Sequence, residues 1–401
     1  LMLTVRRACE ADLDRLVEIH TVAFPDPRRA PERVRNFRSN PLGSLACLRV
    51  VADGDTLVGH GFLFPLQVWF GPRAVPVGGI ASIGVAPEAR GRGVARALLE
   101  HLHAEAAAAG VALTLLYAFR QAFYGALGYG PVAPYHVLRF APAAVPRAFA
   151  HEADLTLRAA RPTDRPALEE VYATAAARGA GQLQRPTALW DRLWLDERRT
   201  WLVVERGGRI VGYVAFTVAA LEMHGRAHAD VHDLVALDDG ARRRLLGALG
   251  GLRDQVEDVV LPVPAGDALP FALTDADRRR PSSLLLEHDL GTVAGGPMLR
   301  VLDEGRALEA RSYPRPGLLR LAVGDSAPRV LRVAGEQGTW APDDPQVPLL
   351  RLERAALASI AFGGLGARAA AALGLAAGDD AALAAAEALF AGPPFFSFDP
   401  F

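Results

Sequence analysis

The chain begins with alternating strand-like and helix-like patterns of apolar positions. Residues 4–8 are predicted to form a strand. Residues 48–52 and 56–64 are rich in β-branched and aromatic side chains, and the Asp-Gly-Asp sequence between them is typical of a hairpin turn. Residues 10–24 predict an amphipathic helix, with apolar side chains at Leu13, Leu16, Val17 and Ile19. These elements indicate an α+β fold built on mixed sheets.

The most informative stretch is a strand, a glycine-rich loop and a helix in succession. Residues 80–85 are apolar and β-branched at alternate positions, and Pro87 ends the strand that they predict. Two glycines follow between Arg90 and Ala95, before a helical pattern formed by Leu98, Leu99 and Leu102. Amide groups at such a helix N-terminus form an anion site suited to a pyrophosphate. A loop that only caps the helix is the simpler alternative.

The first half of the pattern is repeated later in the chain. Residues 4–8 recur as residues 156–160, and residues 50–59 recur as residues 203–212. In the second copy, however, the loop reads Asp238-Asp239-Gly240, and two carboxylates there oppose anion binding. We therefore expect a duplicated fold in which only the first copy holds an anionic ligand.

The remaining chain predicts a third α+β domain. Strands are expected at residues 298–302, 317–323 and 330–334, and helices at residues 352–362 and 381–390. Burial of a phenylalanine contributes about 1.5–3 kcal/mol, so the C-terminal tail should dock inward through its four phenylalanines, Phe395, Phe396, Phe398 and Phe401. A Pro- and Ala-rich linker lies near residues 141–153. The expected domains are residues 1–145, 154–290 and 291–401.

Composition excludes several classes of function. All 44 basic residues are arginine, so the chain can have neither a Walker lysine nor a Schiff-base lysine. The formal net charge is −1, which gives no general attraction to nucleic acid or to an anionic membrane. There is no secretory signal and no apolar span of 18 residues, and two cysteines are too few for a disulfide framework. We expect a cytoplasmic protein without nucleic-acid or membrane partners.

Two weaker patterns are interpreted as structural. His224, His228 and His232 would share a helix face and could bind a metal there, but Gly225 and the strand predicted beyond it argue against one helix. We therefore expect no metal site. The arginine runs at residues 242–244 and 278–280 are short and balanced by acids, which is typical of solvated surfaces.

The glycine-rich loop resembles the acetyl-coenzyme A loop of the GCN5-related N-acetyltransferases, in which Arg90, Gly93 and Ala95 fill the three defined positions. Two such copies, a third domain and a terminal phenylalanine together resemble the Eis (enhanced intracellular survival) family. This resemblance implies tandem GNAT-like domains followed by a sterol-carrier-protein-like domain. It also implies acetyl-CoA as cosubstrate, a homo-hexamer, and a primary amine as acceptor, such as an aminoglycoside or a lysine side chain.

The resemblance also implies roles for individual residues. The general acid of the family falls on Tyr124, although Leu127 replaces a phenylalanine of the family motif, and the general base falls on the C-terminal carboxylate of Phe401. Without the resemblance, Tyr124 is more simply a packed aromatic side chain. The thioester oxygen would contact the backbone of Ile83, Gly84 and Val85. The pyrophosphate would contact Arg90, Gly91, Arg92, Gly93, Val94 and Ala95. The acceptor would contact Phe24, Asp26, Phe37 and Asp399, of which Asp26 is equally well a helix cap.

One departure from the family concerns the acceptor. The family usually has Ser-Glu upstream of the tyrosine, where this chain has Phe119 and Arg120. A cation in place of a carboxylate would weaken the binding of polycationic aminoglycosides.

Two functions from different classes follow from the sequence. The first is an acetyl-CoA-dependent N-acetyltransferase in which the amine attacks the thioester directly in a ternary complex, with a small molecule or a protein lysine as acceptor. The alternative is a carrier that binds an apolar ligand in the third domain and retains a vestigial acetyltransferase domain.

Overall fold

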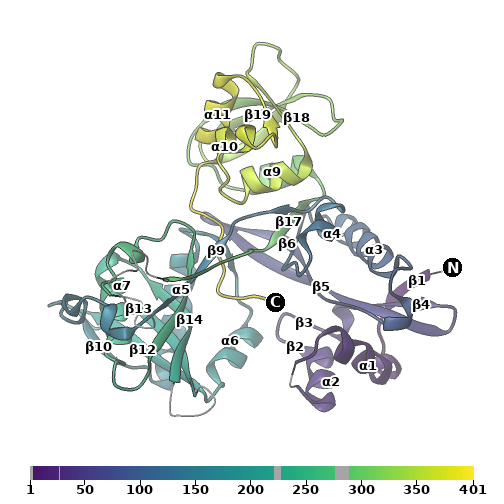
Figure 1. Cartoon of the computed structure of the whole chain (residues 1–401). Coiled ribbons are helices and arrows are strands. Elements are labelled where there is room, and N and C mark those ends of the chain that lie inside the picture. Colours follow the sequence, from purple (N-terminus) through teal and green to yellow (C-terminus); the bar gives the residue numbers. More distant parts are fainter. Residues whose placement is uncertain (1–2, 27, 221–226, 276–288) are drawn as a thin grey trace, which may run out of the picture.

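The computed structural model describes residues 3–26, 28–220, 227–275 and 289–401. Three lobes follow one another along the chain, each built on its own sheet, and the C-terminus lies between the first two (Figure 1). The strands and helices expected from the hydrophobic pattern form within these lobes, which confirms the mixed α/β fold class.

The first sheet has the strand order β1-β4-β5-β6-β7-β17-β8, and β11 also pairs with β5. Its strands are β1 (Leu3–Arg7), β4 (Leu48–Asp53), β5 (Thr56–Phe70), β6 (Arg73–Val85), β7 (Leu113–Leu116), β8 (Gly130–Pro131), β11 (Ala180–Leu183) and β17 (Met298–Val301). A small ribbon, β2 (Ser39–Asn40) with β3 (Gly43–Ser44), lies beside it in the sequence.

Helices cover both faces of this sheet. Apolar side chains of α1 (Leu13–Ala23) and α2 (Ala30–Arg38) pack with Val50 and Phe62, whereas those of α3 (Val94–Ala108) pack with Val51 on the opposite face. The alternation of Val50 and Val51 between the two cores is the period of two expected for a strand buried on both sides. A short helix, α4 (Gln121–Gly125), follows β7.

The second sheet repeats this arrangement with the order β10-β12-β13-β14-β15-β9-β16. Its strands are β9 (Tyr135–Phe140), β10 (Thr156–Ala159), β12 (Arg199–Arg206), β13 (Arg209–Ala220), β14 (Ala227–Ala236), β15 (Asp258–Pro264) and β16 (Gly291–Ala294). Its helices are α5 (Arg165–Ala176), α6 (Thr187–Trp194) and α7 (Asp239–Gly250). The path β10-β12-β13-β14-β15 matches β1-β4-β5-β6-β7, which confirms the duplication expected from the repeat.

The third sheet has the order β20-β19-β18-β21-β22. Its strands are β18 (Gly317–Val323), β19 (Arg329–Ala334), β20 (Gln337–Ala341), β21 (Leu349–Leu352) and β22 (Ala376–Ala377). Its helices are α8 (Glu304–Ala310), α9 (Arg354–Ala361), α10 (Ala367–Ala372) and α11 (Asp380–Phe390).

The first two sheets exchange strands. β9 follows the first copy in the sequence but pairs with β15 of the second sheet, and β17 follows the second copy but pairs with β7 of the first. The strand expected at residues 298–302 therefore forms in the first sheet and not in the third. The three domain ranges stay a prediction, because strands cross between sheets near residues 145 and 291. The exchange ties the first two lobes together by backbone hydrogen bonds.

Candidate active site

The first sheet opens into a fork between β6 and β7. These strands run parallel but pair only at Gly78 with Thr114 and at Gly79 with Leu115. β6 then continues to Val85, whereas β7 ends at Leu116. In the described part of the chain, no strand pairs with this edge of β6 beyond Gly79. The backbone of residues 80–85 is therefore open on that side.

A β-bulge shapes the open edge of β6. Ser82 and Ile83 stand opposite the single residue Gly61 of β5, and Ser82 has a φ of 52°. A left-handed conformation in a residue other than glycine is strained, and bulges of this kind redirect backbone groups beside active sites. The bulge lies where the sequence predicts that Ile83, Gly84 and Val85 contact the thioester oxygen.

The imidazole of a buried histidine, His60, packs against the backbone of β6 next to this bulge. A Cβ atom on Gly84 would lie 2.5 Å from Nε2 of His60, so the backbone of β6 approaches the imidazole closely. Burial and, to a smaller extent, His20 with its ring centroid 5.4 Å away together lower the pKa of His60 to about 3, so His60 is neutral at pH 7. Sequence reasoning missed this pair, because a histidine in an apolar strand carries no local motif.

The glycine-rich loop presents an open helix N-terminus. Gly91 and Gly93 have φ values of 76° and 82°, a left-handed conformation that glycine adopts without strain, and Gly93 is the N-cap of α3. No described side chain caps this helix end, and a Cβ on Gly93 would meet nothing within 4 Å. Arg92 pairs with Asp53 at 2.7 Å, while Arg90 is exposed. The residues present fit a pyrophosphate, whose oxygens would accept hydrogen bonds from the amides of Val94 and Ala95.

The equivalent helix end in the second copy is closed. Asp238 is the N-cap of α7, and its carboxylate accepts a hydrogen bond from the amide of Ala241 at 2.9 Å. The same carboxylate pairs with Arg206 at 2.6 Å. A protein carboxylate thus occupies the position that an anion would take in the first copy, as the sequence led us to expect.

The C-terminal tail runs between the two copies and is docked, as predicted. Phe395 is 1% exposed and packs against Phe70 of β5 with ring centroids 5.9 Å apart. The amide of Phe396 donates to the carbonyl of Ala180 at 2.8 Å. Gly181 has a φ of 102°, and a Cβ there would lie 2.8 Å from the Phe395 ring, so this glycine makes room for the tail.

Arg185 anchors the end of the tail. Its side chain is 1% exposed, donates two hydrogen bonds to Asp233 at 2.6 and 2.8 Å, and donates through Nε to Asp399 at 2.8 Å. Tyr172 donates to the same Asp399 carboxylate at 3.1 Å, and its ring stacks under the guanidinium at 4.1 Å. The structure therefore places Asp399, predicted as an acceptor contact, in a structural ion pair beside the cavity.

We expect Asp399→Asn to loosen the tail. The change removes one of the two carboxylates of Arg185 and leaves Asp233, so the free energy of unfolding should fall by about 1–3 kcal/mol, measured by urea unfolding. Asp380→Asn is the matched control, because that carboxylate is 91% exposed and solvent screens its pair with Arg368, which therefore contributes little to stability. Equal unfolding curves for the two variants would contradict the anchoring role.

Phe401 lies at the fork. A Cβ on Gly79, the last paired residue of β6, would lie 3.1 Å from Cε2 of Phe401. The Phe401 ring also packs edge-on against Tyr117, just beyond β7, with centroids 5.5 Å apart. The ring of the last residue thus lies where the open edge of β6 begins, and the role of its carboxylate stays a prediction. Tyr117 was not predicted as a site residue, since no motif distinguishes it from its neighbours.

Tyr124 lies on α4 within the core of the first lobe. It is 3% exposed and packs against Phe123 and Tyr129 with ring centroids 5.1 and 5.9 Å away. Its hydroxyl makes no hydrogen bond to a described residue, yet it is not fully enclosed, so it is free to donate to a ligand. Burial raises the pKa of Tyr124 to about 12, which keeps it protonated at neutral pH. Its catalytic role stays a prediction.

The other predicted acceptor contacts lie in the α1–α2 region. Asp26 pairs with Arg28 at 2.5 Å and with the buried Arg33 at 3.1 Å, and these arginines hold the pKa of the carboxyl well below its usual range. Phe24 stacks on His20 at 4.6 Å. Phe37 is fully buried against His20 and Phe62, so its position is that of a core residue and does not support an acceptor contact.

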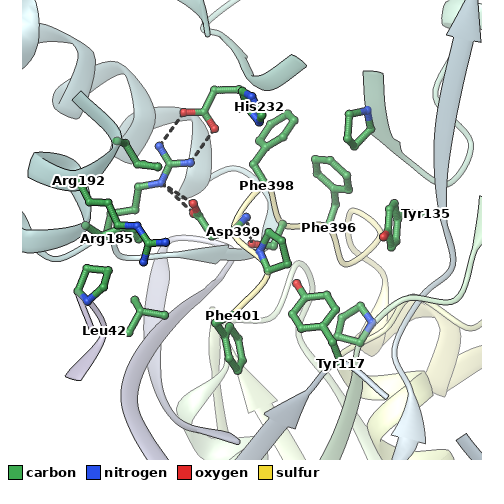
Figure 2. Close-up of a pocket in the computed structure, with 18 of the residues that line it drawn as sticks. Leu42, Tyr117, Tyr135, Arg185, Arg192, His232, Phe396, Phe398, Asp399 and Phe401 are labelled. Atoms are coloured by element: carbon green, nitrogen blue, oxygen red, sulfur yellow. Dashed lines mark hydrogen bonds and ion pairs between the residues drawn. The ribbon is translucent and has the colours of Figure 1, made fainter. Parts of the chain in front are cut away.

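A cavity of about 390 Å³ lies between the first two lobes and reaches the tail (Figure 2). Tyr117, Phe401 and Leu42 line it from the side of the first lobe, and Arg185, Arg192 and His232 line it from the second. Sequence reasoning did not identify these lining residues of the second lobe, which we call the second-lobe wall. Phe119 and Arg120, which depart from the family pattern, do not line this cavity.

Two of the three histidines considered as metal ligands lie on one strand of the second sheet. His224 lies outside the described residues, and His228 and His232 are on β14, paired with Asp230 at 3.0 Å and with Thr217 at 2.9 Å. The described residues contain no group of three or more potential metal ligands. None of the helices in the described ranges combines the length and the apolar character needed to cross a membrane.

Family models match all three lobes. An acetyltransferase (GNAT) domain model matches residues 4–132, a second acetyltransferase (GNAT) domain model matches residues 181–301, and a sterol carrier protein domain model matches residues 305–397. Among characterised proteins, the chain is 28% identical to the N-acetyltransferase Eis of Mycobacterium tuberculosis and to that of Mycobacterium bovis over 331 residues. The match covers 77% of this chain and 77% of each relative.

Solved structures share the whole architecture. A GCN5-related N-acetyltransferase from Anabaena variabilis is 25% identical, covers 100% of both chains and superimposes with a TM-score of 0.85. Eis1 from Mycobacterium abscessus, at 24% identity, matches 99% of this chain and 100% of its own with a TM-score of 0.75. The chain is therefore an N-acetyltransferase with two GNAT domains followed by a sterol carrier protein domain, an organisation in which it resembles the Eis acetyltransferases.

Proposed function

We propose that this protein transfers the acetyl group of acetyl-CoA to a primary amine by direct attack in a ternary complex. The observation that carries the proposal is the position of Phe401, whose ring lies against Gly79 where β6 parts from β7. In this proposal the coenzyme enters the fork from the open N-terminus of α3, and the acceptor enters from the cavity between the lobes.

The reaction needs a neutral amine, a polarised thioester carbonyl and a proton for the departing thiolate. The C-terminal carboxylate of Phe401 takes the proton from the attacking amine. Backbone N–H groups next to the bulge, at residues 83–85, stabilise the oxyanion of the tetrahedral intermediate. When this intermediate collapses, the C–S bond breaks and Tyr124 donates its hydroxyl proton to the sulfur.

A thiol-release assay with a panel of amines tests this function. Small primary amines, an aminoglycoside and a lysine-containing peptide are offered with acetyl-CoA, and calorimetry measures coenzyme binding separately. We expect acetyl-CoA binding and turnover with at least one amine. Absence of both would overturn the proposal, and an apolar ligand retained through purification would then favour the carrier alternative.

Gly93→Asp is expected to weaken acetyl-CoA binding by about 100-fold. The new carboxylate would stand at the N-terminus of α3, as Asp238 stands at that of α7, and would repel the pyrophosphate. Calorimetric titration with acetyl-CoA measures the effect. Gly335→Asp is the matched control, because Gly335 also has a positive φ, of 60°, with open space around it, but lies in the third lobe. Unchanged coenzyme affinity in Gly93→Asp would exclude this loop as the pyrophosphate site.

We also propose that the protein is a homo-oligomer, for which the family resemblance implies a hexamer. Size-exclusion chromatography with light scattering measures the mass of the assembly directly. A monomer of 42.7 kDa would contradict this proposal.

A further inference from the structure

Arginines without close carboxylate partners line the cavity that we assign to the acceptor. Arg192 on α6 is exposed and has no ion pair or hydrogen bond with a described side chain. Arg199 opens β12, its side chain is 14% exposed, and its Nε is buried without a hydrogen-bond partner. The nearest carboxylate to Arg199 is that of Asp196 at 3.6 Å, and Arg198 already donates to this carboxylate at 2.8 Å.

Among the described residues, the acidic side chains that line the cavity form no ion pair with these two arginines. Asp233 and Asp399 both line the cavity, but they are 1% and 9% exposed and are bound by Arg185. Arg185 balances one of these two carboxylates, and burial raises the pKa of Asp399 within the same hydrogen-bonded group. Phe401 contributes the C-terminal carboxylate, which our mechanism uses as the base. The second-lobe wall therefore presents Arg192 and Arg199, with His232 beside them, to an entering molecule.

A buried guanidinium with an unused N–H group favours an anionic partner. Arginine stays charged in proteins, and its donors match the oxygens of carboxylate and phosphate groups. Placing a second cation against it would cost free energy through like-charge repulsion. A polycationic acceptor is thus disfavoured by this wall, whereas an amine that also carries an anionic group would place a negative charge beside Arg192 and Arg199.

We propose that the acceptor of this enzyme is an amine bearing an anionic group, carboxylate or phosphate, which Arg199 and Arg192 bind while the amine faces Phe401. This inference rests on the proposed acetyltransfer and names its substrate class. The two arginines are specificity residues that act on binding of the acceptor. The remaining lining combines apolar side chains, such as Leu42 and Phe396, with polar ones, such as Asn40 and Tyr135, and accommodates the body of the acceptor.

Matched amines test the charge preference. 4-(Aminomethyl)benzoate is compared with benzylamine, O-phosphoethanolamine with ethanolamine, and an aminoglycoside serves as the polycation. We expect kcat/KM for at least one anionic amine to exceed that of its neutral match by about 10- to 100-fold, and the pair that responds identifies carboxylate or phosphate. Neutral or cationic amines that are acetylated as well as the anionic ones would overturn the inference and leave the proposed function intact.

Substitution of the two arginines tests whether they cause the preference for anionic amines. In Arg199→Gln and in Arg192→Gln, the ratio of kcat/KM for the anionic amine to that for its neutral match should fall by about tenfold, mainly through KM. Arg192 is exposed, so its variant tests the wall even if Arg199→Gln destabilises β12. Arg209→Gln is the control, because that side chain is also exposed and in the second lobe but does not line the cavity. Calorimetry with 4-(aminomethyl)benzoate and O-phosphoethanolamine measures acceptor binding independently of turnover. If the ratio of kcat/KM values is unchanged in both Arg199→Gln and Arg192→Gln, these arginines do not determine the charge preference.

Discussion

Tyr124→Phe is expected to lower kcat by about 10²- to 10⁴-fold and to leave acetyl-CoA affinity within twofold of the unchanged enzyme. The substitution removes only the hydroxyl group that would protonate the departing thiolate, and general acid catalysis contributes an effect of this size. The ring packs against Phe123 and Tyr129, contacts that phenylalanine preserves, so the fold should be retained. Steady-state kinetics and calorimetry measure the two quantities.

The pH dependence of kcat follows from the raised pKa of Tyr124. A general acid acts while it is protonated, so activity would decline only as the pH approaches about 12. Below that range, kcat should rise with pH as the acceptor amine loses its proton, and then reach a plateau without a falling limb. Proton transfer from a phenol of pKa about 12 to a thiolate of pKa about 8.5 is uphill by about 5 kcal/mol. Burial of the sulfur in the fork would raise the pKa of the thiol and narrow this difference.

Tyr117→Phe is the comparison that makes the test specific. Tyr117 contacts Phe401 and lines the cavity, so the structure offers its hydroxyl as a rival acid. Burial and the nearby carboxylate of Asp399 raise the pKa of Tyr117 above its ordinary value. If Tyr117→Phe abolishes turnover while Tyr124→Phe does not, the assignment of the general acid moves to Tyr117.

The fold of each copy could be predicted from the sequence, but the exchange of strands between the copies could not. Repeated segments such as residues 50–59 and 203–212 carry the pattern of the strands and hairpins themselves. Pairing of β9 with β15 and of β17 with β7 depends on which sheet edge each strand meets in three dimensions. Both strands are short and apolar enough to fit either sheet, so local pattern does not choose between the edges.

The candidate site was only partly predictable for a similar reason. Gly91 and Gly93 mark their loop because a left-handed backbone favours glycine, which is visible in a single sequence. Arg185, Arg199 and His232 belong to the second copy and reach the cavity only through the packing of the two lobes around the tail. No motif supports the expected contact of Phe37 with the acceptor, and the aromatic core around His20 and Phe62 accounts for its position.

Extending the chain by one residue displaces the terminal carboxylate. The tail is fixed upstream by the Phe395 contacts and by the bond between Arg185 and Asp399, so its last atoms cannot retreat along the chain. An alanine added after Phe401 moves the carboxylate by up to about 3.5 Å and places an amide where the base stood. A carboxylate displaced by that much can no longer accept a hydrogen bond from the attacking amine.

The extended enzyme should therefore lose at least about 100-fold in kcat, the lower range for a general base, while acetyl-CoA binds unchanged at the distant loop. Phe401→Leu is the matched variant, because it keeps the carboxylate at its position and removes only the ring that packs on Tyr117. A small loss in Phe401→Leu beside a large loss in the extended chain would assign the effect to the carboxylate. Full activity of the extended chain would remove the C-terminus from the mechanism and leave the fork, the loop and Tyr124 to be tested without it.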